Sequence, residues 1–406
     1  MGRWRVYLKP FNDSGVYESS WTDISDDVLF DSMGSVAVDL DNTEFDIGVY
    51  RNSSFSLSLI NDHGKYSDIS FPKSVFKYSR GNTLVRITWD YANDYPICGT
   101  GQIGTMQMSN ERTILEGLLS DESLEMEIDD QKAKFKVLGR EFLFQQTVVP
   151  FDTVDNGDLF SVTLYKILNQ TGITDYLTVS QANITCGSDQ TIDSIASLQN
   201  KTVQEGLNKL LLMSNSVLYI KDDTVYVAPR TPTAAVQYTF YGQASESGAE
   251  DIIGIKKIRN GMAKTFNYFT WKDAATLSAE DSTSTAKYGV RKREISADFT
   301  TDTTKRQNIL NALRDEFGMP KQEFDLYTPL DEDTVALELL DRVTIDYPAV
   351  FLSENAPVCG AYTCGENPVL PKALFSFVLD TTEYYKIIGR SIDIKSQVVK
   401  FKMRAV

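Results

Sequence analysis

The chain has 406 residues. A single hydrophobic core rarely organises a chain of this length, so we expect roughly two to four domains. Hydrophobic residues make up 42% of it and charged residues 24%, as in soluble globular proteins. The 56 acidic and 40 basic residues give a formal net charge of −16, and the only dense basic run is Arg291, Lys292 and Arg293. Such a surface repels polyanions, so we expect neither non-specific nor sequence-specific binding of nucleic acid.

The sequence contains no candidate membrane anchor. No stretch approaches the roughly 18 consecutive apolar residues that a membrane span needs, so we expect no membrane span. The first residues, MGRWRVYLKPF, lack the apolar core of a signal peptide. We therefore expect a protein that is made and folded in a cytoplasm.

Histidine and cysteine offer little chemistry. His63 is the only histidine and stands in a turn-like stretch, NDHGKYSD, so a metal site or catalytic base built on histidine lacks a partner. Cys98 and Cys186 are isolated, whereas Cys359 and Cys364 are close together at a spacing that matches no zinc or redox motif. The close pair forms either a hairpin disulfide or two buried thiols, and we favour thiols because nothing else indicates secretion.

Residues 1–150 are typical of a strand-rich domain. Phe55, Leu57 and Leu59 alternate with serines, which predicts a strand with one face on a core and the other in water. Residues 84–90 repeat the pattern. Short runs rich in aromatic and β-branched residues, bounded by Asn, Asp or Gly, predict strands at 4–10, 35–42, 44–52, 53–62, 83–91 and 132–142. Strands at this density favour a barrel or a sandwich.

Residues 151–235 predict a small α/β domain. A first helix has apolar residues at helical spacing, with Asp158 as its N-cap and Gly172 as its stop. A second helix begins with a capping box formed by Thr202 and Glu205. The apolar faces of the two helices comprise Leu164, Ile167 and Leu168, and Val203, Leu207, Leu210 and Leu211. The sequence SVLYIKDDTVYVAP then predicts a tight hairpin that turns at Asp222–Asp223.

Residues 236–406 form a second strand-rich region. Residues 273–287 contain few bulky apolar side chains and predict a mobile loop. A helix is predicted at 304–317, with Thr303 or Thr304 as N-cap and Gly318 and Pro320 at its end. The remaining segments predict strands at 252–262, 264–271, 322–329, 341–348, 384–394 and 398–406.

Carboxylates are the only candidates for reactive groups. They gather in three runs: Asp23, Asp26 and Asp27; Asp39, Asp41 and Asp46; and Asp152, Asp155 and Asp158. None fits a calcium loop, which needs a mid-loop Gly and a closing Glu. We therefore favour the interpretation that these residues stabilise turns and cap helices. The patterns GxSxG, Walker A, GxGxxG before a helix and HExxH are all absent. We therefore predict no catalytic, cofactor-binding or metal-binding residue and no enzymatic activity.

Four stretches carry a family resemblance. SSFSLSLINDHGKYSD, CGTGQIGTMQMSNERTILEGLLSD, TVQEGLNKLLLMSNSVLYIKDDTVYVAP, and QEFDLYTPLDEDTVALELLDRVTIDYP together with YYKIIGRSIDIKSQVVKFKMR follow one another in this order. They resemble the first barrel, the strand that follows it, the inserted α/β domain and the closing barrel of the tail hub proteins of tailed bacteriophages, a group related to the baseplate hub of contractile-tailed phages. The chain departs from the family pattern at Leu340–Asp341, where hub proteins usually have Gly-Asp.

The resemblance implies a mainly β fold with an α+β insertion. Residues 1–150 would form a first β-barrel hub domain, residues 151–235 a small inserted α/β domain, and residues 236–406 a second β-barrel hub domain that includes helix 304–317 and additional C-terminal strands. It also implies a structural virion protein that assembles as a homotrimer, in which two barrels per subunit imitate six-fold symmetry and cap a hexameric tail tube.

The same resemblance implies the partners and the place of assembly. The expected partners are further copies of the chain, the tail tube or distal tail protein, the tape measure protein, and the tail tip or fibre proteins. The expected place is the tail tip of the virion, reached after assembly in the host cytoplasm. A lumen lined with carboxylates would let DNA pass during ejection without adhesion, because like charges repel.

A glycan-binding or glycan-cleaving module is the alternative interpretation. Paired carboxylates for glycoside cleavage meet in space rather than in sequence, so their absence as a motif does not exclude them. Tyrosine and tryptophan rings stack on sugars, and the chain is rich in both; its tryptophans are Trp4, Trp21, Trp89 and Trp271.

Overall fold

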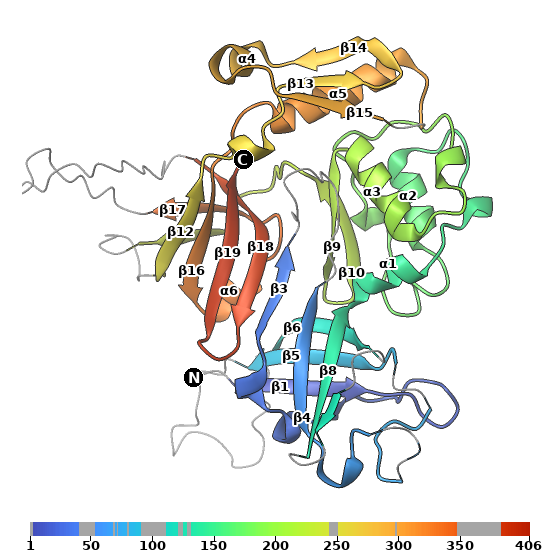
Figure 1. The fold of residues 1–406 in the computed structure, drawn as a ribbon, viewed down its shortest axis with the longest axis vertical. Helices are drawn as coiled ribbons and strands as arrows, with labels where there is room; N and C mark the ends of the chain where they lie inside the picture. The colour runs from blue at the N-terminus through green and yellow to red at the C-terminus, as the bar shows by residue number, and fades with distance from the viewer. Residues whose placement is uncertain are drawn as a thin grey trace, which may run out of the picture.

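The computed structural model describes residues 3–39, 53–67, 70, 72–78, 81–90, 111–120, 125–127, 131–242, 251–296, 299–346 and 383–406. This part of the chain consists of two large β-sheets, a helical region beside a hairpin, and an upper layer of strands and helices (Figure 1). Within it, no helix is long and apolar enough to cross a membrane.

The N-terminal sheet has seven strands, and all of its pairings are antiparallel. Their order is β2, β1, β5, β6, β8 and β4, and β7 pairs with β8. The strands comprise β1 Arg3–Lys9, β2 Thr22–Asp23, β4 Ser54–Ile60, β5 Leu84–Asp90, β6 Glu111–Leu119, β7 Glu125–Glu127 and β8 Lys132–Gly139. The strands predicted at 4–10, 53–62, 83–91 and 132–142 are confirmed, and the one predicted at 44–52 lies outside the described residues.

The alternation in β4 is confirmed on its core side. Phe55, Leu57 and Leu59 are buried, and Ser54 and Ser56 are exposed. Ser58 is buried as well, because the segment before it in sequence lies over this end of the strand: the Leu29 amide donates to the Ser58 carbonyl at 2.9 Å. The second face of the strand is therefore only partly in water.

The helical region follows the predicted order. It comprises α1 Leu143–Gln146, α2 Phe160–Leu168, α3 Val203–Met213, β9 Ser216–Lys221 and β10 Thr224–Pro229. The capping box of Thr202 and Glu205 is present, and the hairpin turns at Asp222–Asp223 as predicted. Asp222 has a φ of 55°, a left-handed conformation that aspartate tolerates in a two-residue hairpin turn.

The predicted ends of α2 were wrong. Leu159, not Asp158, is the N-cap, and the helix ends at Leu168, before Gly172. The carboxylate of Asp158 accepts hydrogen bonds from the Lys166 ammonium at 2.8 Å and from the Asp155 amide at 3.1 Å. Because the side chain of Asp158 folds toward these partners, it does not cap the helix.

The upper layer overturns the expectation of a mobile loop at 273–287. Its elements are β13 Tyr268–Trp271, β14 Ala274–Glu280, α4 Ser282–Tyr288, β15 Lys292–Ile295 and α5 Thr303–Phe317. The predicted loop forms β14 and most of α4. Bulky residues are not required there, because β14 pairs with β13 through its backbone and Asp281 caps α4 by accepting from the Ser284 amide at 2.9 Å.

Helix α5 matches the helix predicted at 304–317 and ends before Gly318, as expected. Its N-cap is Asp302 rather than Thr303 or Thr304: the Asp302 carboxylate accepts from the Thr304 and Lys305 amides at 2.7 and 3.0 Å. A carboxylate also interacts favourably with the positive end of the helix dipole, which explains why Asp302 is the better cap.

The C-terminal sheet also has seven strands, in the order β11, β17, β18, β19, β16 and β12, with β3 paired to β18. Its elements are β3 Ser35–Asp39, β11 Tyr238–Tyr241, β12 Gly254–Arg259, β16 Glu323–Pro329, α6 Glu332–Ala336, β17 Arg342–Asp346, β18 Tyr385–Asp393 and β19 Val398–Ala405. The sheet curls: the Asp251 amide bonds the carbonyl of Tyr241 on β11, and the Ile253 amide bonds the carbonyl of Tyr327 on β16. These bonds bring the two edges together at one end.

Two hydrophobic cores hold these parts. One core joins the inner faces of both sheets, and the other joins α2 and α3 to the upper layer. The mainly β fold with curled, half-barrel sheets and an inserted α/β region is as predicted. The division at residues 150 and 235 stays a prediction; β3 crosses from the first third of the chain into the C-terminal sheet.

Leu340 generates a test of backbone strain. It is buried with a φ of 68°, at the position where hub proteins usually have Gly. This conformation costs a leucine about 1–2 kcal/mol, which glycine avoids. Leu339→Gly removes a similarly buried side chain without relieving backbone strain. We therefore expect the loss in the free energy of unfolding, measured with urea, to be at least about 1 kcal/mol smaller for Leu340→Gly than for Leu339→Gly. Equal losses would show that the left-handed backbone stores no strain.

Candidate functional site

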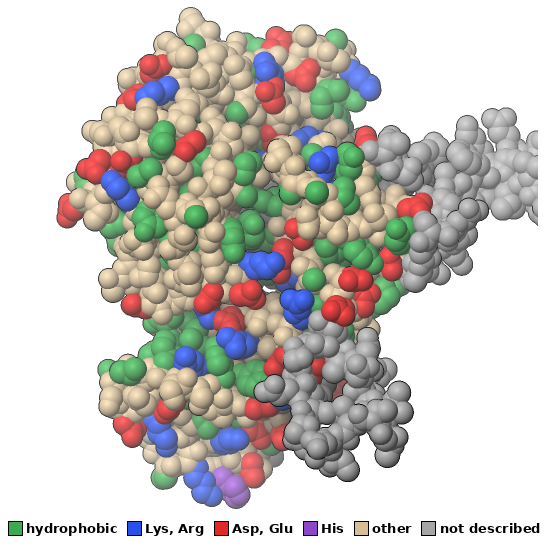
Figure 2. Space-filling model, turned by 180° about the vertical axis from the view of Figure 1, so that it is seen from behind, with side chains coloured by type: hydrophobic (Ala, Val, Ile, Leu, Met, Phe, Trp, Pro, Cys, Tyr) green, Lys and Arg blue, Asp and Glu red, His purple; other side chains and the backbone are tan. Residues whose placement is uncertain are grey.

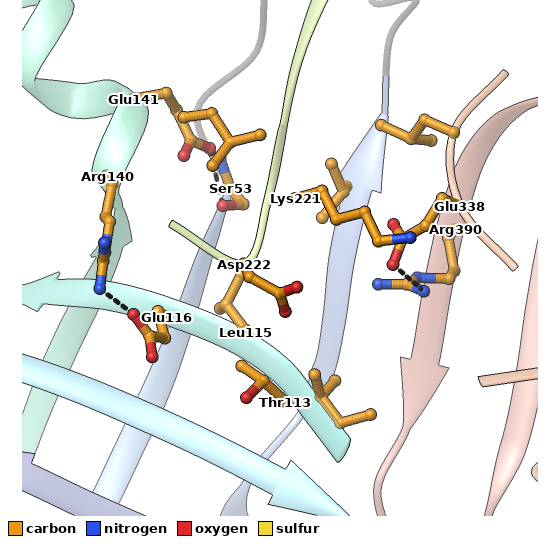
Figure 3. Close-up of a pocket in the computed structure, with 14 residues that line it drawn as sticks. Ser53, Thr113, Leu115, Glu116, Arg140, Glu141, Lys221, Asp222, Glu338 and Arg390 are labelled. Carbon is orange, nitrogen blue, oxygen red and sulfur yellow. Dashed lines mark hydrogen bonds and ion pairs between the residues drawn. The ribbon is translucent and has the colours of Figure 1, made fainter. Parts of the chain in front are cut away.

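The candidate site is the place where the two sheets and the tip of the β9–β10 hairpin meet, called the junction below (Figure 3). It encloses a cavity of about 50 Å³, room for a few water molecules and not for a substrate. Charged side chains of both signs surround it: Glu116, Arg140, Glu141, Lys221, Asp222, Glu338 and Arg390.

Glu116 and Arg140 form the most deeply buried pair of the junction. Their side chains are 4% and 6% exposed, and Arg140 Nη2 donates to Glu116 Oε2. Arg86 on β5 donates to the other oxygen of Glu116, and Arg140 Nη1 donates to the Tyr176 carbonyl at 2.5 Å. Burial lowers the pKa of Arg140 to about 10, so the guanidinium stays charged at neutral pH. The pair links the N-terminal sheet to the helical region.

Gly139, at the end of β8, makes room for a second buried carboxylate. Glu141 Oε1 accepts from the amide and the hydroxyl of Ser53, the latter at 2.7 Å. A Cβ atom at Gly139 would collide with the side chains of Ser53 and Glu141. Only glycine therefore lets β8 end here with the start of β4 held beside it.

The opposite wall of the junction belongs to the C-terminal sheet. Arg390 on β18 donates to the Leu337 carbonyl at 2.7 Å and lies 3.6 Å from Glu338 Oε1. Burial raises the pKa of Glu338. The nearby carboxylates of Asp341 and Asp222 raise it further, and the cations Arg390 and Lys221 oppose the rise only in part. The hairpin tip thus brings a cation and an anion to this wall.

A second buried network ties the upper layer to the C-terminal sheet. Glu316 on α5 accepts from Lys386 on β18 at 2.9 Å and from Lys321 at 3.1 Å. Burial alone would raise the pKa of Glu316, but Lys386, Lys321 and Arg404 outweigh it and hold the pKa far below its ordinary value. Lys386 also donates to the Arg230 carbonyl at 2.5 Å, which anchors the linker after the hairpin.

The residues singled out from sequence have structural contacts. His63 is an exposed turn residue with a φ of 54°, as predicted. Cys186 is a free, half-buried thiol, and burial raises its pKa to about 11, which keeps it protonated. Cys98, Cys359 and Cys364 lie outside the described residues.

Five carboxylates of the acidic runs have cationic or hydroxyl partners: Asp23, Asp27, Asp39, Asp155 and Asp158. Asp23 accepts from Ser25, Asp27 from Lys65 and Tyr66, and Asp39 lies 3.3 Å from Lys402. Lys166 bonds both Asp155 and Asp158, so a lysine ammonium occupies the place where a calcium ion would bind. Asp41 and Asp46 lie outside the described residues. In the described part of the chain, no group of three or more His, Cys, Asp or Glu is placed to hold a metal ion.

Three of the four tryptophans are buried and cannot stack on a sugar: Trp4, Trp89 and Trp271. The fourth, Trp21, is covered by the Arg86 guanidinium, 4.2 Å from the ring, and has Lys9 at 6.0 Å. The four tryptophans named in the sequence-based argument for a glycan site are therefore buried or covered on one face.

The junction was not predicted from the sequence. Glu116, Arg140, Glu338 and Arg390 are far apart in the chain and belong to no motif. The available signal was weak: charged residues at positions where the strand alternation called for an apolar or small side chain. Chemically, the arrangement pairs buried charges, and the Ser53 hydroxyl that lies beside the Glu141 carboxylate is itself buried.

Known structures share this architecture. A tail protein from Neisseria meningitidis MC58 is similar over 100% of this chain and 96% of its own, with 10% sequence identity and a TM-score of 0.54. A prophage tail protein from Listeria monocytogenes EGD-e is similar over 98% and 94%, with 9% identity and a TM-score of 0.53. The chain has the fold of phage tail proteins. No protein-family model matches the sequence, and no curated protein matches it.

Removal of one junction charge tests how much the buried pair matters for this tail-protein fold. Glu116→Gln leaves Arg140 buried without its carboxylate, so we expect a loss of about 3–5 kcal/mol in the free energy of unfolding, measured with urea. Asp155→Asn is the control, because Asp155 is 71% exposed in its pair with Lys166, and we expect a loss within about 1 kcal/mol. Similar losses for both variants would contradict the assignment.

Glu338 predicts a pH dependence. Its pKa in the folded protein lies above the ordinary value of 4.5, so the folded state holds this proton more tightly than the unfolded state does. The stabilisation is therefore complete below pH 4.5 and is lost as pH rises through the raised pKa. We expect the free energy of unfolding of Glu338→Gln to increase relative to that of the wild type as pH rises from 4 to 8. Urea unfolding at each pH measures this difference.

Glu205 supplies a control of opposite sign. The Thr202 amide lowers its pKa, so its contribution to stability is present above pH 4.5 and is lost as pH falls. Glu205→Gln should therefore become less stable relative to the wild type as pH rises to about 5, with little further change up to pH 8. The same slope for both variants would refute the link between burial and the pKa of Glu338.

Proposed function

We propose that this chain is a tail hub: a structural virion protein that forms a homotrimeric ring and joins the tail tube, or the distal tail protein that ends it, to the tail tip or fibres. DNA and the tape measure protein pass through the ring. The protein belongs to the tail of the virion and carries no enzymatic activity of its own.

The extent of the structural likeness carries the proposal. It covers 100% of this chain and 96% of the Neisseria tail protein, so the two sheets, the inserted α/β region and the upper layer are shared as one arrangement. A likeness confined to one sheet would support only a common β-fold. Because identity is only 10%, the fold is shared without a shared set of surface residues.

The arrangement of the two sheets supports a ring. Each subunit presents two half-barrel sheets that share one core, so three subunits supply six similar units around an axis. Most assemblies of identical subunits have closed symmetry, and a six-fold arrangement matches a hexameric tube.

The junction supports the role of a connector. A subunit that transmits geometry from a tube to a tip needs a fixed relation between its sheets. The buried pair of Glu116 and Arg140 restricts movement between the N-terminal sheet and the helical region, and the network around Glu316 restricts movement between the upper layer and the C-terminal sheet. The junction cavity is too small for a substrate, which favours a structural role over a catalytic one.

Electron microscopy of the purified protein and of tails that carry it tests the proposal. We expect a three-fold ring centred on the tube axis at the tip end of the tail. A position away from the axis, or two-fold symmetry, would refute the hub role. Thermal melting with a panel of neutral glycans distinguishes a hub from a glycan-binding or glycan-cleaving module. A hub should show no sugar-dependent shift in Tm.

A further inference from the structure

The two sheets repeat one arrangement of strands. In chain order, one series is β1, the segment 22–29, β4, β5, β6 and β8, and the other is β11, β12, β16, β17, β18 and β19. In both series the first member pairs with the fourth, the fourth with the fifth, the fifth with the sixth, the sixth with the third, and the third with the second. Only the first strand differs in direction, since β1 is antiparallel to β5 and β11 is parallel to β17. We call the two series the N-terminal unit and the C-terminal unit.

The fourth strands of the two units also share a sequence pattern. β5 contains RITWD at residues 86–90, and β17 contains RVTID at residues 342–346. In each strand the two apolar residues are buried in the core, and the arginine lies over an aromatic ring: Arg86 is 4.2 Å from the centroid of Trp21, and Arg342 is 3.5 Å from that of Tyr384. The shared pairings and the shared pattern indicate two copies of one unit. A contact that one unit makes therefore predicts a contact for the other.

Within the chain, the N-terminal unit reaches the C-terminal unit just after its second member. The chain continues from the segment 22–29 into β3, which pairs with β18 along Gly389–Asp393. Asp31, before β3, lies 3.9 Å from Lys395 in the turn that joins β18 to β19. In Figure 2, Lys, Arg, Asp and Glu side chains gather at the level where the N-terminal sheet, at the lower end, meets the rest of the molecule. The second member of one unit thus lies near the turn between the fifth and sixth members of the other.

The equivalent segments of the two units carry opposite charge. Residues 22–32 contain four aspartates and no Lys or Arg, whereas residues 254–264, which include β12, contain three lysines, one arginine and no carboxylate. The connection between the fifth and sixth members is acidic in the N-terminal unit, with six carboxylates and no Lys or Arg in residues 120–131. In the C-terminal unit this connection carries Lys395. Inside the chain an acidic segment thus meets a basic turn, and the basic β12 and the acidic β6–β8 connection form a second complementary pair.

β12 is exposed in the single chain and lies on the side of the C-terminal sheet away from the β9–β10 hairpin (Figure 1). Its exposed residues are Lys256, Lys257, Ile258 and Arg259. The carboxylates beneath them on β16 are buried, with Asp325 7% and Glu323 4% exposed. Asp325 lies 3.5 Å from Lys257, and Glu323 lies 3.0 Å from Lys264. These carboxylates offset part of the positive charge but lie below the surface that a partner touches.

We propose that β12 of one copy binds the acidic β6–β8 connection of the next copy, at β7. The contact joins the C-terminal unit of one copy to the N-terminal unit of the next, as a ring of alternating units requires, and the inference rests on the proposed ring. Such a contact is head-to-tail, the type that closes rings. Opposite charges steer the two surfaces together and fix their register. Equal units are kept apart, because a contact between two N-terminal units would bring acidic segments together and one between two C-terminal units would bring basic segments together.

The contact between copies differs in one respect from the contact within the chain. β17 pairs with β18 only at Tyr385 and Lys386, which leaves room for β3 on the same edge. On β6 the corresponding edge is occupied by β5 from Glu111 to Leu118. An added strand finds no free edge there, so side chains make the contact between copies. Because exposed charges dominate such a contact, salt weakens it.

A nucleic-acid backbone is the other occupant that a basic strand suggests. Ile258, 41% exposed, stands among the cations of β12, and phosphate binding gains nothing from an exposed isoleucine. On the acidic side, Met126 of β7 is 44% exposed. Methionine and arginine are both enriched at protein interfaces, and apolar residues among charges suit such a contact. The observations therefore favour a second copy of the chain.

Carbodiimide cross-linking of the full chain tests the proposal, since this reagent joins lysine amines to carboxylates in contact with them. Isotope-labelled and unlabelled protein are mixed at high salt and returned to low salt. We expect cross-links from Lys256 and Lys257 to carboxylates of residues 120–131 that join a labelled chain to an unlabelled one. Asp31 and Lys395 are the internal control, because their cross-link should join residues of the same chain.

Charge reversal on β12 supplies a second measurement, by sedimentation at low salt. Lys256→Glu with Arg259→Glu should form trimers at least about tenfold more weakly than the wild type, because an acidic β12 then faces an acidic connection. The control, Lys272→Glu with Lys287→Glu, makes the same charge change on the exposed upper layer and should associate as the wild type does. Circular dichroism confirms that each variant is folded.

The outcomes separate this inference from the proposed function. If trimers form and β12 cross-links instead to the C-terminal sheet of another copy, or if the β12 variant associates as the wild type does, the ring stands and the assigned interface is wrong. If the wild type is a monomer at every concentration, both the ring and its interface are refuted. Binding of a short DNA duplex that is lost in the β12 variant would make β12 a nucleic-acid site and overturn the proposal.

Discussion

Burial of opposite charges between different elements of the fold is the constraint on which this structure depends. Glu116 and Arg140 are almost fully withdrawn from water, and each is tolerated only because the other is present. Glu316 and Lys386 repeat the arrangement between the upper layer and the C-terminal sheet. Apolar packing allows many relative positions of these elements, whereas a buried charge pair has low energy in very few of them. The two networks therefore select one geometry from those that the cores allow.

The two hydrophobic cores also join different parts of the fold. The first joins the inner faces of the two sheets, and the second joins the helices to the upper layer. The β9–β10 hairpin contributes to the second core while its tip, at Lys221 and Asp222, reaches the charged junction of the first. The hairpin therefore connects the two cores of the described chain.

The sequence by itself determined the β-rich fold, the capping box at Thr202, the hairpin and α5, since alternation, helical spacing and turn residues are local properties. It misjudged 273–287, because backbone pairing to β13 stabilises β14 without bulky side chains. Only the tertiary structure decided that β3 joins the C-terminal sheet, that Leu340 takes a left-handed conformation, and that the junction charges meet. Each of these depends on residues more than a hundred positions apart or on the space that packing leaves, and neither is encoded in a local pattern.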